Sequence, residues 1–168
     1  MKLIDEKRNV TYRIVSGVAA IIVGWAIVHD QIIVRIAPEH FTEYHEPVGS
    51  IENPFVLAFL WAIAATLGLG LILGIVYAFI GRNGARPKVS VRFILVGTAV
   101  VICLIEMVSS GSGWWVFRTE KALYPGAWYP VDEVKILVTQ TMQISAYLAS
   151  AVLSTALGFL IWAKRKFP

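Results

Sequence analysis

All three histidines of the chain lie close together in the sequence, among acidic residues. His29 and Asp30 end the first apolar stretch, and a polar segment holding Glu39, His40, Glu43 and His45 follows. Imidazole and carboxylate are the ligand types that Zn, Mn or Fe sites use, and a short segment confines them to a small volume. His40 and Glu43 are three residues apart, so both could reach one ion from a helix. The sequence therefore predicts a candidate site for a divalent transition metal, with these ligands: His29, Asp30, Glu39, His40, Glu43 and His45.

The alternative to a metal site is an acidic, solvated loop whose histidines cap helices or pair with acids. The sequence has no HExxH motif, and Thr42 stands where a Glu-x-x-His repeat of a di-metal bundle needs its glutamate. Cys103 is the only cysteine, so neither an intramolecular disulfide nor a thiolate metal cluster is available. Both interpretations of the segment stay open.

A second group of polar residues falls inside the apolar stretches. Glu106 lies about one turn before the polar Ser109-Ser110-Gly111 segment, at a depth similar to that of two glutamines in the last stretch. A charge in hydrocarbon costs about 2.5–3.5 kcal/mol on insertion scales, so it normally faces the bundle interior and a partner. We expect a polar layer that serves either as a proton, ion or cofactor site or as a network that locks the helices. Its predicted members are His29, Asp30, Gln31, Arg35, Glu106, Gln140 and Gln143.

Four long apolar stretches must position these residues, at about residues 10–29, 54–80, 91–110 and 134–162. A helix needs about 20 apolar residues to cross a hydrocarbon core of about 30 Å. The chain is 57% hydrophobic and only 15% charged, whereas soluble domains have about 25% charged residues. The sequence therefore predicts an all-α integral membrane four-helix bundle in the lipid bilayer, with residues 1–168 forming a single transmembrane domain.

The basic residues indicate the topology. Of the fifteen Lys and Arg, four lie on one side of the predicted membrane, namely Arg35, Arg118, Lys121 and Lys135, and the other eleven lie on the opposite side. The positive-inside rule then predicts a multi-pass protein with both termini in the cytoplasm. The membrane is expected to be the bacterial cytoplasmic (inner) membrane. The first apolar run is longer than the ~7–15 residues of a signal-peptide core, so we expect an uncleaved span. The net charge of +4 is thus a topology signal, and no nucleic-acid binding is expected.

The first outer loop is predicted to contain a short interfacial helix at Pro38–Glu46. Its opening proline suits the first helical position. Phe41, Tyr44 and His45 share one face, while His40 shares the other with two carboxylates. This pattern is typical of a helix that lies at the membrane surface with its aromatic side down. The second outer loop is predicted to be rich in aromatic residues that settle at headgroup level, namely Trp114, Trp115, Phe117, Tyr124, Trp128 and Tyr129.

Small residues recur at intervals of four along three of the stretches. The second stretch has Ala58, Ala62, Thr66, Gly70, Gly74 and Ala78, the fourth has Ala146, Ser150, Ser154 and Gly158, and the first has Ser16, Ala20 and Gly24. Lipid gives helices no hydrophobic reason to associate, so close backbone approach has to supply the packing. We expect tight contacts for the second and fourth spans. Their partner is another span of the chain, a second copy in a homo-oligomer, or another membrane protein.

The segment from His29 to His45 resembles a family of small bacterial four-span membrane proteins. The resemblance rests on His29-Asp30-Gln31 as an HDQ motif, and on Glu39-His40-Phe41-Thr42 followed by His45 as an E-x-F-T…H motif. It extends through the second span to Arg86-Pro87-Lys88. The family carries an aromatic residue at the position of His40, so the resemblance favours His29, Asp30, Glu39 and His45 as site residues. It implies the architecture and the location of the site, but not an activity.

Three functions are consistent with these features. An accessory or assembly component with an outward-facing His/carboxylate site needs only the packing residues and a partner, and it is the simplest interpretation. A membrane metalloenzyme or metal-binding protein would use the same site. A small proton- or ion-coupled transporter would rely on Glu106.

Overall fold

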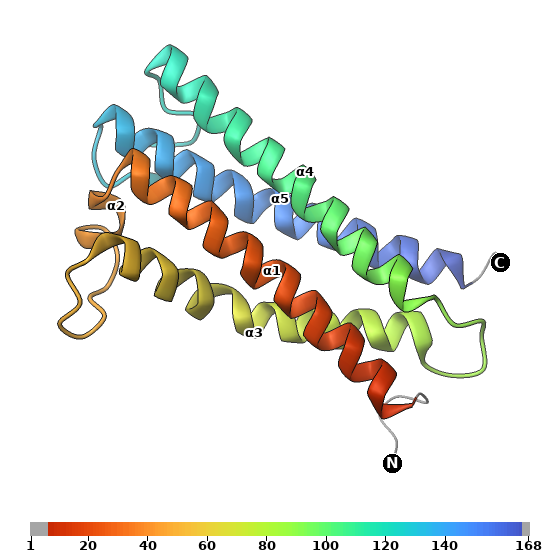
Figure 1. The fold of residues 1–168 in the computed structure, drawn as a ribbon. Coiled ribbons are helices and arrows are strands. Elements are labelled where there is room, and N and C mark those ends of the chain that lie inside the picture. Colours follow the sequence, from red (N-terminus) through yellow and green to blue (C-terminus); the bar gives the residue numbers. More distant parts are fainter. Residues whose placement is uncertain (1–6, 166–168) are drawn as a thin grey trace.

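The computed structural model describes residues 7–165, which fold into a bundle of long helices (Figure 1). The helices are α1 (Arg8–Ile36), α2 (Glu39–Thr42), α3 (Pro54–Arg82), α4 (Val91–Thr119), the 3-10 helix η1 (Gly126–Trp128) and α5 (Val134–Lys164). Each of α1, α3, α4 and α5 is long and apolar enough to cross a membrane. The predicted all-α four-helix membrane bundle is therefore confirmed.

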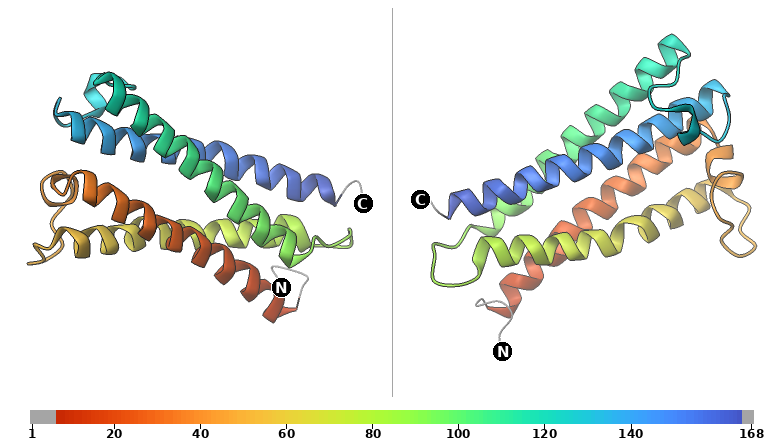
Figure 2. Two further views of the ribbon diagram at one scale, coloured as in Figure 1. Left: turned by 45° about the horizontal axis from the view of Figure 1, so that its top comes forward. Right: turned by 180° about the vertical axis from the view of Figure 1, so that it is seen from behind.

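The four long helices pack as two antiparallel pairs. One pair is α1 with α3 and the other is α4 with α5, and the two pairs lie on opposite sides of the bundle in Figure 2. Between the two pairs, α1 contacts α4 most extensively, and the contacts of α5 with α3 and with α1 are smaller. Helix α1 is therefore the element that connects the two halves, and residues on it can reach both.

Local signals set where α3 and α4 begin. The side chain of Asn53 accepts hydrogen bonds from the backbone N–H groups of Phe55 and Val56, at 3.0 and 3.3 Å, and Pro54 occupies the first helical position. Ser90 accepts from the backbone N–H of Phe93 at 3.2 Å. Asn and Ser satisfy amide groups that have no partner within the helix, and proline has no such group to satisfy.

All four long helices extend beyond their predicted spans, α1 and α4 by the most. Helix α1 continues through the HDQ motif to Ile36, and α4 continues to Thr119. Hydroxyl groups make this extension of α4 compatible with apolar surroundings, because they bond back to carbonyls one turn earlier. Thr119 Oγ1 donates to the carbonyl of Trp115 at 2.9 Å, for example. The prediction that Trp114, Trp115 and Phe117 lie in the outer loop is therefore wrong, since all three are on α4.

The interfacial helix α2 is shorter than predicted, and His40 points into the bundle instead of toward solvent. It forms a single turn, Glu39–Thr42, instead of Pro38–Glu46. His40 and Phe41 are both 1% exposed, and α2 packs against α1, α3 and α5. The prediction that His40 shares a solvated face with the carboxylates is wrong, because the side chain enters the bundle and finds a hydroxyl partner there.

The second outer loop folds back on α5 through its tyrosines. The hydroxyl of Tyr129 accepts hydrogen bonds from the backbone N–H groups of Leu123 and Tyr124, at 3.2 and 3.1 Å. The same hydroxyl lies 2.8 Å from Thr141 Oγ1, and that of Tyr124 lies 2.8 Å from Ser145 Oγ. The loop is thus held against the end of α5 by polar contacts as well as by apolar ones.

Small residues bring α3 against α1. A Cβ atom added at Gly70 would lie 2.9 Å from Ala19 Cα, and one at Gly74 would lie 2.8 Å from Val15 Cα. The predicted tight contact of the second span therefore exists within the chain. In α5 the approach is looser, since a Cβ at Gly158 would meet side-chain atoms only at 3.7 Å or more. The short series of the first span faces outward, namely Ser16, Ala20 and Gly24.

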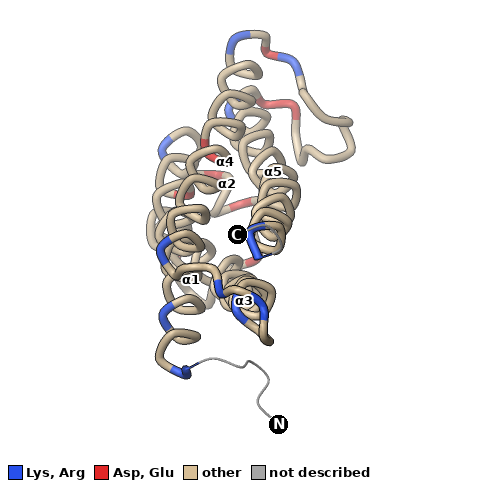
Figure 3. Tube along the Cα trace, turned by 90° about the vertical axis from the view of Figure 1, so that its right-hand side faces the viewer, with Lys and Arg blue, Asp and Glu red and all other residues tan. Residues whose placement is uncertain are grey.

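The two ends of the bundle differ in charge, and Figure 3 looks from the end that carries the 83–90 loop, with Lys and Arg in blue and Asp and Glu in red. The start of α1, the end of α5 and the 83–90 loop lie at one end, here called the basic end, which carries most of the described Lys and Arg. The acidic end carries the 37–53 and 120–133 loops, and every Asp and Glu of the described residues lies in that half. Separate apolar cores hold the ends, around Phe41 and Met142 at the acidic end and around Tyr77 and Ile161 at the basic end.

Candidate functional site

A carboxylate and an imidazole meet inside the bundle between α1 and α4. Glu106 Oε2 lies 2.9 Å from His29 Nδ1 and accepts a hydrogen bond from Trp25 Nε1 at 2.8 Å. Glu106 Oε1 accepts from Ser110 Oγ at 2.7 Å. The carboxylate therefore has partners for both oxygens, which is what an acidic group at membrane depth requires.

The other ring nitrogen of His29, Nε2, has no hydrogen-bond partner among the described residues. The side chain is 3% exposed. A neutral imidazole has one N–H and one lone pair, so a hydrogen on Nδ1, shared with Glu106, leaves the lone pair on Nε2. The ring stacks on Trp25 with centroids 5.2 Å apart and lines a small pocket of about 30 Å³. His29 is therefore positioned to exchange a hydrogen bond or a proton on that side.

Asp30, Gln143 and His40 continue the polar group from His29. Asp30 is 8% exposed and lines the same small pocket together with Gln143. The Gln143 side chain lies close to both the Asp30 carboxyl and the His40 ring. His40 Nδ1 lies 3.1 Å from Thr139 Oγ1, whose hydroxyl donates to the carbonyl of Ile136. The hydroxyl then accepts from Nδ1–H, so the unpartnered Nε2 of His40 also carries a lone pair.

His45 connects this group to the surface of the acidic end. Its Nδ1 lies 2.7 Å from the carbonyl oxygen of His40, and the two rings lie 5.0 Å apart. His45 is half-buried, whereas burial, and after it the neighbouring His45, lower the pKa of His40 to about 4. His40 is therefore neutral at neutral pH. We call this group the buried relay, and its members are Glu106, His29, Asp30, Gln143, His40 and His45.

Three residues predicted for the polar layer lie elsewhere. Gln31 Nε2 donates to the carbonyl of Phe55 at 2.9 Å, and Arg35 contacts the Gln31 carbonyl and lies over the Phe55 ring. Gln140 Nε2 donates to the carbonyl of Trp128 at 3.3 Å. Gln31 and Arg35 thus hold the start of α3 and Gln140 holds the second outer loop, away from the buried relay.

The candidate metal ligands are divided between the interior and the surface. Glu39 Oε1 pairs with Lys135 Nζ at 3.2 Å, and hydrogen bonds from its own backbone N–H and from Lys135 hold the pKa of Glu39 below its usual range. Glu43 is exposed. Over the range 7–165, no three His, Cys, Asp or Glu side chains gather as a set that could hold a metal ion. The geometry thus gives a divalent metal at His29, Asp30, His40 or His45 no support.

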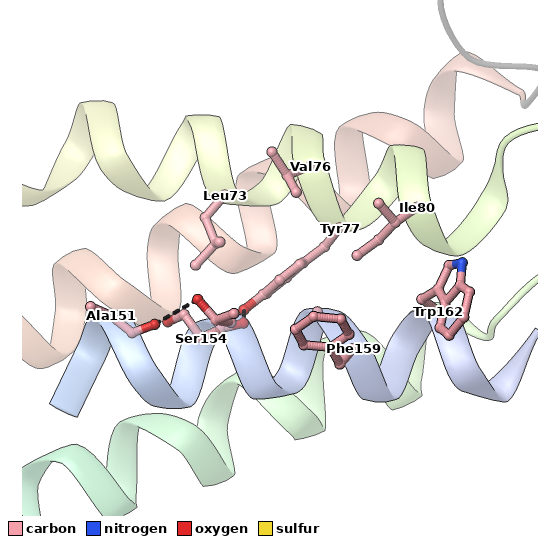
Figure 4. A pocket seen from close by; sticks show the side chains of 10 residues that line it. Leu73, Val76, Tyr77, Ile80, Ala151, Ser154, Phe159 and Trp162 are labelled. Atoms are coloured by element: carbon pink, nitrogen blue, oxygen red, sulfur yellow. Dashed lines mark hydrogen bonds between the residues drawn. The ribbon is translucent and has the colours of Figure 1, made fainter.

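An apolar cleft runs from the buried relay toward the basic end. One cavity, of about 540 Å³, is lined by residues of α1, α3, α4 and α5 and shares Trp25, Thr66 and Tyr147 with the small pocket at His29. A second cavity, of about 560 Å³, continues between α3 and α5 to Trp162 (Figure 4). The two cavities share Leu73, Val76, Ala151 and Ser154. We call the two together the α3–α5 cleft.

The sequence reasoning missed three side chains that complete the relay. Trp25 and Ser110 each stand four residues from a recognised member, His29 and Glu106 respectively. Thr139 stands four residues before Gln143 and bonds to His40. Residues four apart share a helix face, so this spacing was the signal that could have found them.

The fold and this site define a class, which is a multi-pass membrane four-helix bundle with titratable groups buried at one end. Comparison of the chain with protein-family models, with curated proteins and with solved structures gives no match. The resemblance to small bacterial four-span proteins therefore stays a prediction, and the function has to be argued from the site.

Proposed function

We propose that the protein is a small proton-coupled membrane transporter, in which the buried relay takes up and releases protons. The observation that carries the proposal is the contact of Glu106 with His29, at 2.9 Å inside the bundle. A carboxylate and an imidazole at hydrogen-bond distance can share a proton. His29 presents a second, unpartnered nitrogen on its other side, so a proton can leave the pair as well as enter it.

The arrangement of the other groups supports the same function. The relay extends from Glu106, whose side chain is 28% exposed, through the nearly buried His29 to the half-buried His45. Asp30, Gln143 and His40 are buried beside His29, and Gln143 lies close to the other two. Chains of carboxylate and imidazole groups at membrane depth are typical of proton paths in pumps and transporters.

The distribution of charge supports an orientation for this transporter. Most of the described Lys and Arg lie at the basic end, and the positive-inside rule places such an end in the cytoplasm. We therefore propose that both termini face the cytoplasm, in the bacterial inner membrane that is expected from the sequence. The buried relay then faces outward, and His45 is its aqueous entrance.

Two other functions have less support from the geometry. A metalloenzyme would need ligands that converge on one ion, and the candidate ligands are separated. An accessory or assembly component would bind a partner or a second copy through small residues, but those of α3, at Gly70 and Gly74, already contact α1. The corresponding residues of α5, Ser150, Ser154 and Gly158, line the α3–α5 cleft.

The protonation of His29 tests the proposal directly. The protein is placed in lipid nanodiscs with nitrogen-labelled histidines, and the ring resonances are recorded from mildly acidic to alkaline pH. We expect the His29 resonances to titrate in the wild type and to change their titration in Glu106→Gln. Glu52→Gln, which alters an exposed loop carboxylate, is the matched control and leaves them unchanged.

The opposite outcome would be a His29 ring that does not change its protonation state. If His29 keeps one protonation state over the whole range in a folded protein, the group only locks the helices together. The transporter proposal is then wrong.

A further inference from the structure

The α3–α5 cleft and the small pocket at His29 form one path with a polar end and an apolar length. Trp25, Thr66 and Tyr147 line both the pocket and the first cavity, so the two adjoin. The cavities of about 540 and 560 Å³ fall within the ~300–1,000 Å³ usual for sites that bind small molecules. A molecule with a small polar head and a long apolar tail matches this shape, with its head at His29.

The charge of the lining excludes many membrane lipids as the occupant. Among the described residues, no Lys or Arg lines the pocket or either cavity, and Asp30 is the one ionisable acid. A phosphate head would meet a carboxylate and no cation, which is unfavourable in a low dielectric. The pocket at His29, about 30 Å³, has room for a group about the size of one water molecule. The head is therefore neutral, and its inserted group is small.

The hydrogen-bond chemistry of His29 specifies the head further. Nδ1 is 2.9 Å from the Glu106 carboxylate, so the hydrogen they share leaves a lone pair on Nε2. Nε2 is buried and unpartnered within residues 7–165, and an unmet buried polar atom is costly. A hydroxyl group is the small neutral donor that satisfies it. Trp25, which stacks on His29, and Tyr147 offer aromatic surfaces beside that position.

We propose that the α3–α5 cleft binds a neutral lipid with a hydroxyl head, whose hydroxyl donates to His29 Nε2 and whose tail runs toward Trp162. This proposal extends the proposed function, because it names a ligand class for the site that exchanges protons. Two kinds of membrane lipid share the chemistry, a quinol with a prenyl tail and a prenyl alcohol. The aromatic ring of the quinol distinguishes them.

Binding is measured with the full chain in nanodiscs of a zwitterionic phospholipid. The probes are a prenyl quinol kept reduced, its dimethyl ether and farnesol, and the readout is quenching of tryptophan fluorescence together with retention of the probe. We expect the quinol or farnesol to bind saturably, and the ether to bind about tenfold more weakly, because it lacks the donor. Preference for the quinol over farnesol identifies the aromatic head, and the reverse identifies a prenyl alcohol.

Two adjacent positions on α5 give a matched pair of variants. Ala151 lines both cavities of the cleft, whereas Val152 is 68% exposed and lines neither. Ala151→Phe fills the tail site and is expected to weaken binding about tenfold, while Val152→Phe binds as the wild type does. If Ala151→Phe does not fold, a photoreactive farnesol is crosslinked to the wild type, and the attachment sites are mapped by mass spectrometry. Attachment to the cleft residues of α3 and α5 supports the proposal.

Other outcomes overturn this inference without touching the proposed function. Equal binding of the ether and the quinol, competition by anionic phospholipid, or crosslinks confined to the outer surface would each show that the cleft takes bilayer lipid nonspecifically. A second copy that fills the cleft would appear as a dimer that Ala151→Phe dissociates. The His29 titration is a separate readout, so failure of proton exchange and failure of lipid binding are distinguishable.

Discussion

The Nδ1 atom of His29 lies 2.9 Å from Oε2 of Glu106 and joins α1 to α4 inside the bundle. Trp25 donates to the same oxygen at 2.8 Å, so two groups of α1 depend on one residue of α4. Within the described chain α1 also packs on α3 and α5, and loosening this contact therefore affects both halves of the bundle.

Replacing Glu106 by Ala is expected to destabilise the bundle more than replacing it by Gln. Alanine leaves Trp25, His29 and Ser110 without their acceptor, whereas the amide oxygen of glutamine keeps part of the contacts. Hydrogen bonds in membrane bundles contribute about 0.6 kcal/mol each on average and up to about 1.7 kcal/mol. Unfolding in mixed micelles, followed by circular dichroism, measures the difference. Equal stability of both variants and the wild type would contradict the prediction.

Gly74→Ala is expected to destabilise the α1/α3 pair. The added Cβ would lie 2.8 Å from Val15 Cα and 3.0 Å from its carbonyl oxygen, so the backbones must separate. Overpacking of this kind costs about 1–3 kcal/mol. Gly68→Ala on the same helix is the control, because a Cβ there meets nothing within 4 Å. Thermal aggregation in detergent is the measurement, and equal midpoints for both variants would mean that the close approach is absent.

The sequence predicts the spans and the depth of each residue in the membrane, but not the direction in which a side chain points. Hydropathy identifies the four spans, because length and apolarity are all that crossing a bilayer requires. Counting depth from the span ends places Glu106 level with His29 and Gln143, and the structure brings them together in the buried relay. Depth does not specify which way a side chain points, since each residue turns about 100° around the helix axis.

The sequence does not give the angular position of a residue around its helix axis, and this explains why several residues were misplaced. Gln140 has the predicted depth but faces the outer loop at Trp128, and Arg35 covers the Phe55 ring. His40 was assigned to solvent because its neighbours are acidic, whereas the turn after Ala37 directs it into the bundle. Hydropathy does not predict this turn, because the turn depends on how α2 packs against α5.

Acid is expected to destabilise the protein through His40. Burial lowers the pKa of His40 from 6.5 to about 4 in the folded state. As the pH falls from about 6.5 to about 4, the unfolded chain binds a proton at this residue and the folded protein does not. The stability that is present above this window is therefore lost progressively within it. Melting temperatures across the window measure the effect, and His40→Gln is expected to flatten the curve. An unchanged slope in His40→Gln would show that other groups dominate.

Tyr129→Phe is expected to loosen the 120–133 loop. The change removes one hydroxyl that accepts from the backbone N–H groups of Leu123 and Tyr124 and bonds to Thr141. Hydrogen exchange at the two amides should accelerate, while exchange in α3 stays the same. Tyr12→Phe, at a side chain that is 61% exposed, is the control. Unaltered exchange at Leu123 and Tyr124 would be inconsistent with the loop contacts.

Arg165→Lys is expected to release the 83–90 loop from the end of α5. The guanidinium donates to the carbonyls of Ile80 and Pro87, both at 2.9 Å, to that of Asn83 at 2.6 Å and to that of Arg86 at 3.3 Å. Lysine keeps the charge but cannot reproduce a planar set of donors. Proteolysis between Asn83 and Val89 measures the release, and Lys164→Ala is the control. Equal cleavage of the two variants would refute the role of the guanidinium.

The same arginine bears on the order in which the protein is assembled. A ribosome makes the 83–90 loop before α4 and α5, so its carbonyl groups enter the membrane interface before Arg165 exists. During that interval the carbonyls of Asn83, Arg86 and Pro87 lack the guanidinium that later donates to them. The α1/α3 hairpin, with its own close glycine contacts, can form in the meantime. Synthesis of the end of α5 then fastens the hairpin to the rest, so the last turn of the bundle acts as the closing step of its biogenesis.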